Sequence, residues 1–180
     1  MIPENTSTAK VWVENNKLIT LISATEKKLD LSEESYTEIS SNAFKNVLVV
    51  EQIFLPKKLR EIKESAFEKC GDLKIVAFVG TDEKGERPSA SELRIQSNAF
   101  ADCRNLDSVH IKCNKLTLEK DAFAGCNKLR VVFLECNDLD FRTGAFQNSP
   151  NLTIFGKKTT APFDLEDFCK KSGVEFKDIN

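Results

Sequence analysis

Hydrophobic residues recur along this chain in a unit of about 23 residues, and the copies share one pattern. Each unit contains an Ala-Phe pair, with a large apolar residue four positions before the alanine and, in most copies, a small residue three positions after the phenylalanine. Three apolar residues spaced as in L-x-x-V-x-I follow. The pairs begin at Ala43, Ala66, Ala99, Ala122 and Ala145, at intervals of 23, 33, 23 and 23 residues. One repeat length with a single insertion explains these intervals and predicts a solenoid.

The L-x-x-V-x-I segment of each unit predicts a short strand of a parallel sheet. Its last two apolar residues are two positions apart, so they share one face of a strand while the residue between them points the other way. We expect the apolar side chains to face inward and to stack from unit to unit. They are Val50, Ile53 and Leu55; Leu73, Val76 and Phe78; Leu106, Val109 and Ile111; and Leu129, Val132 and Leu134, with Leu152 and Phe155 beginning a fifth copy.

A second apolar pair, such as Leu116 and Leu118, is predicted to return the chain along the opposite wall. The Ala-Phe pair is then expected to make a helical or 3₁₀ turn. If the units stack about 5 Å apart, the spacing of strands in a sheet, the phenylalanines form an internal column. This predicted structural ladder consists of Phe44, Phe67, Phe100, Phe123 and Phe146, with Cys70, Cys103 and Cys126 in the small-residue position.

The two ends of the chain differ from the repeats, as capping units must. Two β-rich runs around Asn15-Asn16 predict a hairpin. Near the other end, Asp164 is a candidate helix N-cap, Gly173 a helix stop, and a last strand follows. We therefore expect one domain over 1–180, which is an α/β repeat solenoid. Its N-terminal cap is 1–38, and its repeats are 39–163 with an inserted polar loop at 80–92. Its C-terminal helix-strand cap is 164–180.

The six cysteines first suggest thiol chemistry, but their positions favour packing. The small-residue position that holds three of them is filled by Val47 and Ser149 in other units, and a buried cysteine behaves as a small hydrophobic residue. No Cys-x-x-Cys pair or other metal-ligand spacing occurs, so the sequence predicts neither a metal nor a cofactor. Buried free thiols are the favoured state, and disulfides between neighbouring units, Cys103 with Cys126 or Cys113 with Cys136, are the alternative.

Composition and charge exclude several classes of function. Lys plus Arg total 26 against 28 Asp plus Glu, so no bulk charge favours nucleic acid or an anionic membrane. The sequence contains neither an apolar run of membrane-spanning length nor the pattern of a secretory signal at its start. His110 is the single histidine, is expected to point outward from its strand, and has no nucleophile or carboxylate in a defined relation to it. We therefore predict that the chain is not an enzyme.

The residues between the inward-facing positions form the surface most relevant to function. Several of them are large and apolar where a solvated face would carry polar residues, and exposed apolar patches mark protein contacts. A partner site is the favoured interpretation, and self-association or cover by another part of the chain are the alternatives. The candidate partner-binding residues are Gln52, Phe54, Ile75, Ala77, Ser108, His110, Val131, Phe133 and Ile154, with Gly156 continuing the second row.

The frame I-x-x-x-A-F-x-x-C-x-x-L-x-x-V-x-I, repeated every 23 residues from Ile39 to about Phe163, resembles the bacterial surface protein A-like (BspA-like) leucine-rich repeats. The ending "FCKKSGVEF" is similar to the helix-strand closure of such arrays. The resemblance implies a right-handed leucine-rich-repeat coil and an extracellular or cell-surface protein, since several members are adhesins that bind host proteins.

Together, the residues and the resemblance favour a non-catalytic protein–protein interaction module that binds a protein partner through its concave sheet. The alternative is a structural or self-assembling unit of a larger surface or intracellular complex. No nucleic-acid binding and no membrane insertion are expected.

Overall fold

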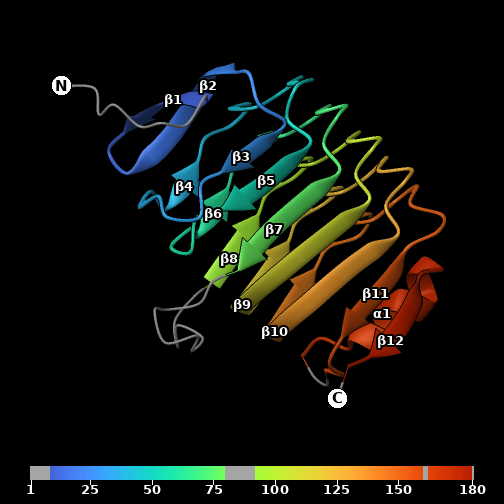
Figure 1. Cartoon of the computed structure of the whole chain (residues 1–180). Coiled ribbons are helices and arrows are strands. Elements are labelled where there is room, and N and C mark those ends of the chain that lie inside the picture. The colour runs from blue at the N-terminus through green and yellow to red at the C-terminus, as the bar shows by residue number, and fades with distance from the viewer. Residues whose placement is uncertain (1–8, 80–91, 160–161, 180) are drawn as a thin grey trace.

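The chain coils into a solenoid whose cross-section has two walls of parallel strands. In the computed structural model, residues 9–79, 92–159 and 162–179 are described. Each coil, here called a rung, is numbered one to five by the Ala-Phe pair at which it begins. It then runs along one wall, crosses to the other and ends before the next Ala-Phe pair. Figure 1 shows the rungs stacked from the N-terminal to the C-terminal end of the molecule.

One wall, the main sheet, contains the L-x-x-V-x-I segments. It is formed by β3 (Lys28–Asp30), β5 (Gln52–Leu55), β7 (Ile75–Val79), the first halves of β9 (Ser108–Leu118) and β10 (Val131–Phe141), β11 (Thr153–Gly156) and β12 (Glu175–Asp178), all parallel.

The other wall, the second sheet, contains the returning apolar pairs. It is formed by β1 (Ala9–Glu14), which is antiparallel to β2 (Lys17–Ala24), then β4 (Glu38–Ile39), β6 (Glu61–Ile62), β8 (Glu92–Ile95) and the second halves of β9 and β10.

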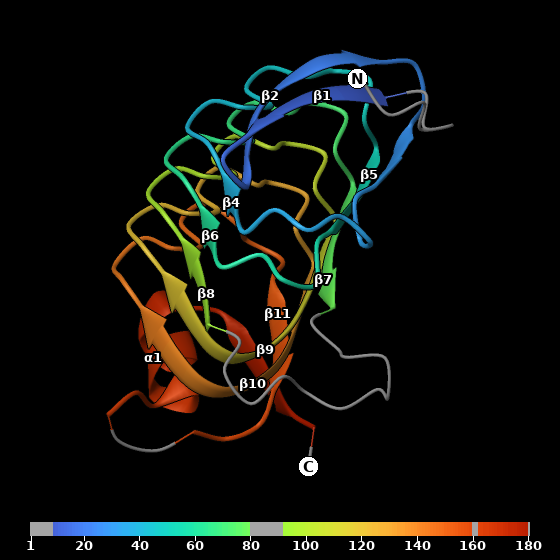
Figure 2. The same cartoon turned by 90° about the vertical axis from the view of Figure 1, so that its left-hand side faces the viewer.

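The two walls are joined because β9 and β10 belong to both. Each of these strands has 11 residues and bends between the walls, as Figure 2 shows, and they pair with each other on both sides of the bend. In the first rung the walls are instead connected by residues that include Pro56, which ends β5 because proline cannot donate to a sheet ladder. The inserted loop expected at 80–92 lies outside the described residues except for Glu92, which begins β8.

The core between the walls follows the alternation predicted from the sequence. In β5, Ile53 and Leu55 are buried while Gln52 and Phe54 are partly exposed, and β7, β9, β10 and β11 repeat this alternation. Each inward residue lies beside its counterpart in the next rung, as Ile53 lies beside Val76. Removing these stacked aliphatic side chains from water is the main driving force for closing the coil.

The Ala-Phe pairs make hydrogen-bonded turns, not the helical or 3₁₀ turns expected. The N–H of Phe67 donates to the carbonyl of Ala99 in the next rung at 2.7 Å, and Phe44, Phe100 and Phe123 make the equivalent bond at 2.7–2.8 Å. The phenylalanine rings stack face to face, with centroids 4.7, 4.8, 4.9 and 5.5 Å apart along the column from Phe44 to Phe146. The turns therefore form a third hydrogen-bonded side of the solenoid.

Left-handed backbone conformations explain why these turns do not continue into helices. The residue before each Ala and the residue two after each Phe have positive φ, and a residue of that conformation ends a helical run. Asparagine, aspartate and glycine tolerate it best, and they fill most of these positions. The positions are Asn42, Ser65, Asn98, Asp121 and Gly144 before Ala, and Asn46, Lys69, Asp102, Gly125 and Asn148 after Phe.

The ends of the solenoid adopt the structures expected from their local signals. Asn15 and Asn16 have φ of 48° and 65° and join β1 to β2 in an antiparallel hairpin. The helix α1 (Leu165–Ser172) begins after Asp164, whose side chain accepts a hydrogen bond from the N–H of Asp167, and ends at Gly173, which has φ of 68°. Leu165 and Cys169 on α1 are buried against the last rung, so the helix covers the C-terminal end of the core.

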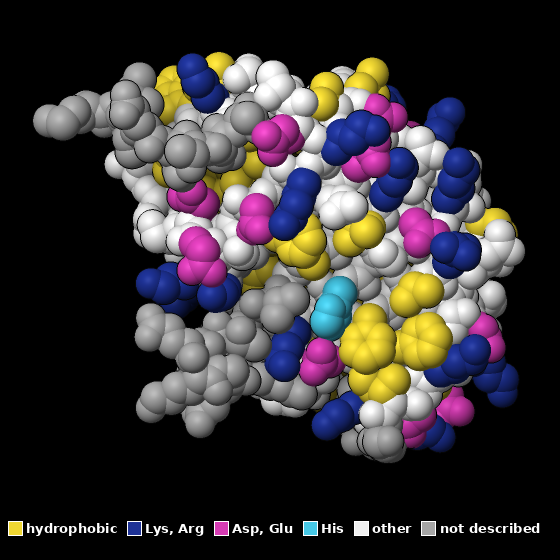
Figure 3. Space-filling model, viewed as in Figure 1, with side chains coloured by type: hydrophobic (Ala, Val, Ile, Leu, Met, Phe, Trp, Pro, Cys, Tyr) yellow, Lys and Arg dark blue, Asp and Glu magenta, His cyan; other side chains and the backbone are white. Residues whose placement is uncertain are grey.

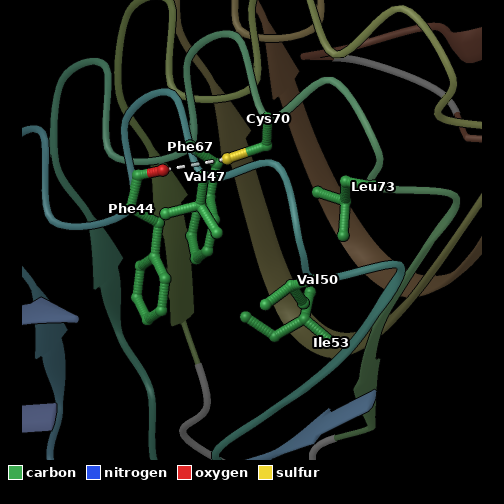
Figure 4. A pocket seen from close by; sticks show the side chains of 7 residues that line it. All are labelled: Phe44, Val47, Val50, Ile53, Phe67, Cys70 and Leu73. Atoms are coloured by element: carbon green, nitrogen blue, oxygen red, sulfur yellow. Dashed lines mark hydrogen bonds between the residues drawn. The ribbon is translucent and has the colours of Figure 1, made fainter. Parts of the chain in front are cut away.

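A small apolar gap remains in the core between the first two rungs (Figure 4). Valine at position 50 stands where the next three rungs have Leu73, Leu106 and Leu129, so one methylene is missing from the stack. The lining residues are Phe44, Val47, Val50, Ile53, Phe67, Cys70 and Leu73.

Filling this gap should stabilise the protein. We expect Val50→Leu to raise the free energy of unfolding by about 0.8 kcal/mol, the value of one buried methylene group. Urea titration followed by circular dichroism measures the change. The matched control Leu73→Val removes a methylene from the equivalent position and should lower stability by about 1 kcal/mol. A loss of stability in Val50→Leu would mean that the gap cannot accept the larger side chain.

Candidate interaction surface

The outward-pointing residues of the main sheet form two parallel rows, here called the outer face. Strand pairing sets the rows because each residue lies beside its counterpart in the neighbouring strand. One row is Lys28, Gln52, Ile75, Ser108, Val131, Thr153 and Glu175, and the other is Asp30, Phe54, Ala77, His110, Phe133, Phe155 and Lys177.

Eight of the nine residues predicted for partner binding lie on the outer face, and Ile154 does not. The prediction for Ile154 was wrong, because this side chain pairs with Val132 and is fully buried in the core. Thr153 and Phe155 take the outward positions, so Phe155 is not the inward residue expected of a fifth copy. Gly156 also lies on the buried side.

This error arises because the last repeat is one residue shorter than the others. Leu129 and Val132 are three positions apart, but Leu152 and Ile154, which take the same places in the core, are two positions apart. A one-residue shift exchanges the two faces of a strand. The residue types in "TIFG" could have indicated the shift, since isoleucine favours the core over threonine.

An aromatic cluster occupies the C-terminal half of the outer face. The ring of His110, on β9, meets that of Phe133, on β10, edge-on at 5.1 Å. Phe133 then stacks against Phe155, on β11, at 6.2 Å with 24° between the rings. Figure 3 shows these apolar side chains gathered beside the single histidine. The Lys177 ammonium lies 5.5 Å from the ring centroid of Phe155, so a cation borders the cluster.

His110 is fixed on one side by a carboxylate. Its Nε2 lies 3.0 Å from Oε1 of Glu135, and Nζ of Lys112 lies 3.5 Å from the other oxygen of the same carboxylate. Burial raises the pKa of Glu135, but the hydrogen bond to His110 and the charge of Lys112 outweigh it and hold the pKa below its usual range. This pairing orients the imidazole on the sheet, and the side chain of His110 remains 40% exposed, as expected for an outward strand residue.

The outward positions of the second sheet are of the opposite character. They are filled mainly by charged side chains that pair with one another, such as Lys17 with Glu38 at 3.2 Å and Lys63 with Glu61 at 3.0 Å. Arg94 pairs with Glu119 in the next rung. Such pairs contribute little to stability in water, but they keep a surface hydrated. Among the repeat strands, the apolar outward face therefore belongs to the main sheet. The terminal hairpin of the second sheet also exposes apolar side chains, Trp12 at 53% and Ile22 at 63%.

The thiols in the small-residue position are structural. Cys70, Cys103 and Cys126 each donate a hydrogen bond from sulfur to the phenylalanine carbonyl of the preceding rung, at 3.0–3.2 Å. Figure 4 shows the bond from Cys70 to Phe44. Hydrogen bonding to Cys70, together with burial, raises the pKa of the Cys103 thiol, and burial raises the pKa of the Cys126 thiol to about 12. The thiols of Cys103 and Cys126 are therefore held in the unreactive protonated form.

The described part of the chain contains no group of three His, Cys, Asp or Glu side chains placed to hold a metal ion. Within the same residues, no helix is long and apolar enough to cross a membrane.

The thiols should be protected in the folded protein. All six cysteines are buried, so we expect 5,5′-dithiobis(2-nitrobenzoate) at pH 8 to label the reduced native protein slowly and to titrate six thiols in guanidinium chloride. Absorbance at 412 nm follows the reaction. As a control, Gln147→Cys adds a thiol at an exposed turn, which should react at once. Rapid labelling of Cys103 or Cys126 in the native protein would contradict the burial described above.

Comparison with known proteins identifies the class of repeat. The family model of the BspA type leucine-rich repeat region matches six copies over residues 24–153. The chain therefore belongs to the BspA-type leucine-rich-repeat family. The match begins before the first Ala-Phe pair, and β3 supplies a main-sheet strand there, so the array has about six turns where about five repeats were expected.

Two solved structures share the fold. The leucine-rich repeat protein TpLRR of T. pallidum has a TM-score of 0.60 and 18% sequence identity, over 82% of this chain and 68% of that one. The pneumococcal vaccine antigen PcpA has a TM-score of 0.60 and 14% identity, over 92% of this chain and 44% of that one. The chain thus spans about two thirds of the first protein and less than half of the second. No curated protein matches the sequence.

Proposed function

We propose that this protein is a non-catalytic interaction module that binds a protein partner through the outer face of its main sheet. One observation carries the proposal: among the repeat strands, the outward residues of the main sheet include several aromatic and aliphatic side chains, whereas those of the second sheet are mainly ion-paired. The repeat requires only that inward positions be apolar, so apolar residues that point outward need another reason.

The outer face has the composition of a protein contact. Aromatic side chains such as Phe133 and Phe155 dominate the energetics of interfaces because they bring large apolar areas at low cost in conformational entropy. Charged groups border them, with Lys28 4.7 Å from the ring centroid of Phe54 and Lys177 near Phe155. A partner that covers the rings while leaving these charges at the rim would match the usual anatomy of an interface.

The relatives support an interaction role and suggest where it takes place. Leucine-rich repeats generally mediate protein interactions, and the family and fold are typically non-catalytic. Because one structural neighbour is a pneumococcal vaccine antigen, a cell-surface or extracellular role with adhesion to host proteins is included in the proposal. Self-assembly through the same face is the alternative role, and it makes the opposite prediction about oligomeric state.

Two substitutions on the outer face test the proposal. We expect Phe54→Asp together with Phe133→Asp to abolish binding to the protein partner, because each change places a charge where an apolar contact is buried. Both side chains are partly exposed, so the melting temperature and far-ultraviolet dichroism should change little. Binding is measured by surface plasmon resonance against a panel of purified extracellular-matrix and mucosal proteins.

The control variant adds the same charge elsewhere. Thr117→Asp with Gln147→Asp alters the second sheet and an exposed turn, and it should bind like the wild type. Size-exclusion chromatography with light scattering separates the two roles: a monomer supports partner capture, whereas an oligomer that the Phe54/Phe133 variant dissociates supports self-assembly. Unfolding of that variant, or equal binding by both variants, would argue against the outer face as the binding site.

A further inference from the structure

Two buried cysteines on neighbouring rungs differ from the other thiols in what their sulfur atoms contact. Cys113 on β9 and Cys136 on β10 occupy the same place in consecutive repeats and are direct partners in the strand register. Their Sγ atoms lie 3.3 Å apart. Cys113 is 0% and Cys136 4% exposed, so the pair belongs to the core.

The geometry points to an unassigned modification site: we propose that Cys113 and Cys136 form a reversible disulfide that joins the third and fourth rungs. Partners in neighbouring parallel strands have Cα atoms about 4.8 Å apart, within the range of about 4.4–6.8 Å that disulfides require. The remaining gap between the sulfur atoms can close by rotation about χ1 and a small approach of the two strands.

The pair lies at the bend between the two walls. The ladder between β9 and β10 pairs Cys113 with Cys136 and resumes at Lys115 with Asp138, so the residues between them are outside the strand register. The side chain of Asn137 donates a hydrogen bond from Nδ2 to Oδ1 of Asn114 at 2.8 Å. The proposed cross-link therefore lies where the chain passes from one wall to the other.

The other thiol column lacks this arrangement. The sulfur atoms of Cys103 and Cys126 are directed to the phenylalanine carbonyls of the preceding rungs, at 3.0 and 3.2 Å. Cross-linking those two cysteines would require both hydrogen bonds to break in the turns that hold the phenylalanine column. Cys136 reaches the carbonyl of Ile111 only at 3.8 Å, and Cys113 donates to the carbonyl of Lys115 at 3.3 Å, within its own strand. Cross-linking this pair therefore leaves the turns of the phenylalanine column intact. The two columns therefore predict different products of oxidation.

The reaction is a thiol–disulfide exchange with a small-molecule disulfide as the oxidant. In a local opening of the bend, the Cys136 thiolate attacks the small disulfide and releases one thiol, which leaves a mixed disulfide. The Cys113 thiolate then attacks the Cys136 sulfur and releases the second thiol. Two electrons and two protons pass from the protein to the oxidant, and excess small thiol reverses both steps.

Mass spectrometry of the oxidised full chain tests the proposal. The reduced protein is incubated with oxidised glutathione at pH 8, denatured and alkylated with iodoacetamide. Because the chain has six cysteines, loss of two should leave four alkylated thiols and no bound glutathione. Tryptic digestion should give one cross-linked species that joins residues 113–115 to residues 131–142. The melting temperature of the oxidised protein should rise by several degrees and return on reduction.

Matched variants identify the pair. Cys136→Ser should abolish the cross-link, whereas Cys126→Ser, which removes a thiol of the other column, should retain it. The peptide map of the wild type decides the matter even if a variant does not fold. Six alkylated thiols after oxidation, a stable glutathione adduct on Cys136, a cross-link between Cys103 and Cys126, or a disulfide between two molecules would each overturn the proposal.

Discussion

The stacking of one Ala-Phe turn on the next is the constraint on which the rest of this solenoid depends. Each turn donates a backbone hydrogen bond to the alanine carbonyl of the following rung, and each phenyl ring lies on its neighbour at 4.7–5.5 Å. This distance is close to the spacing of strands in a sheet. The turns and both walls therefore share one rise per rung, and the inward residues of all three sides can meet in a common core. A side chain larger than alanine beside the ring would hold successive turns apart.

The sequence predicts the repeated parts of this structure well because the copies of the repeat can be compared with one another. Four copies of one pattern identify the inward residues of β5, β7, β9 and β10, and capping signals at Asp164 and Gly173 identify the bounds of α1. Prediction fails where no second copy exists for comparison. The last repeat is one residue short, so Ile154 was assigned to the wrong face. The bend that carries β9 and β10 through both walls also has no local signal, because it depends on tertiary pairing between the two strands.

Other features are visible in the sequence, but their structural role is clear only from the backbone conformation. The Asn, Asp and Gly residues around each Ala-Phe pair match positions of positive φ, and their recurrence could have excluded a helix there. The candidate surface was predicted in most of its residues, since alternation alone places Phe54, His110 and Phe133 outward. Its asymmetry with the second sheet was not predicted, because charge pairs such as Lys17 with Glu38 form between strands far apart in the sequence.

The shared strands also have a consequence for how the chain folds. In a simple solenoid each rung contacts only its neighbours, so ordered structure can begin at any rung and spread. Here β9 and β10 pair at ten positions on the two sides of the bend, while the shorter strands of earlier rungs pair with each other at two to four positions on each wall. Strands that make many contacts with each other and lie close together in the sequence tend to pair early in folding. We therefore expect the third and fourth rungs to act as the folding nucleus, on which the N-terminal rungs are added one at a time.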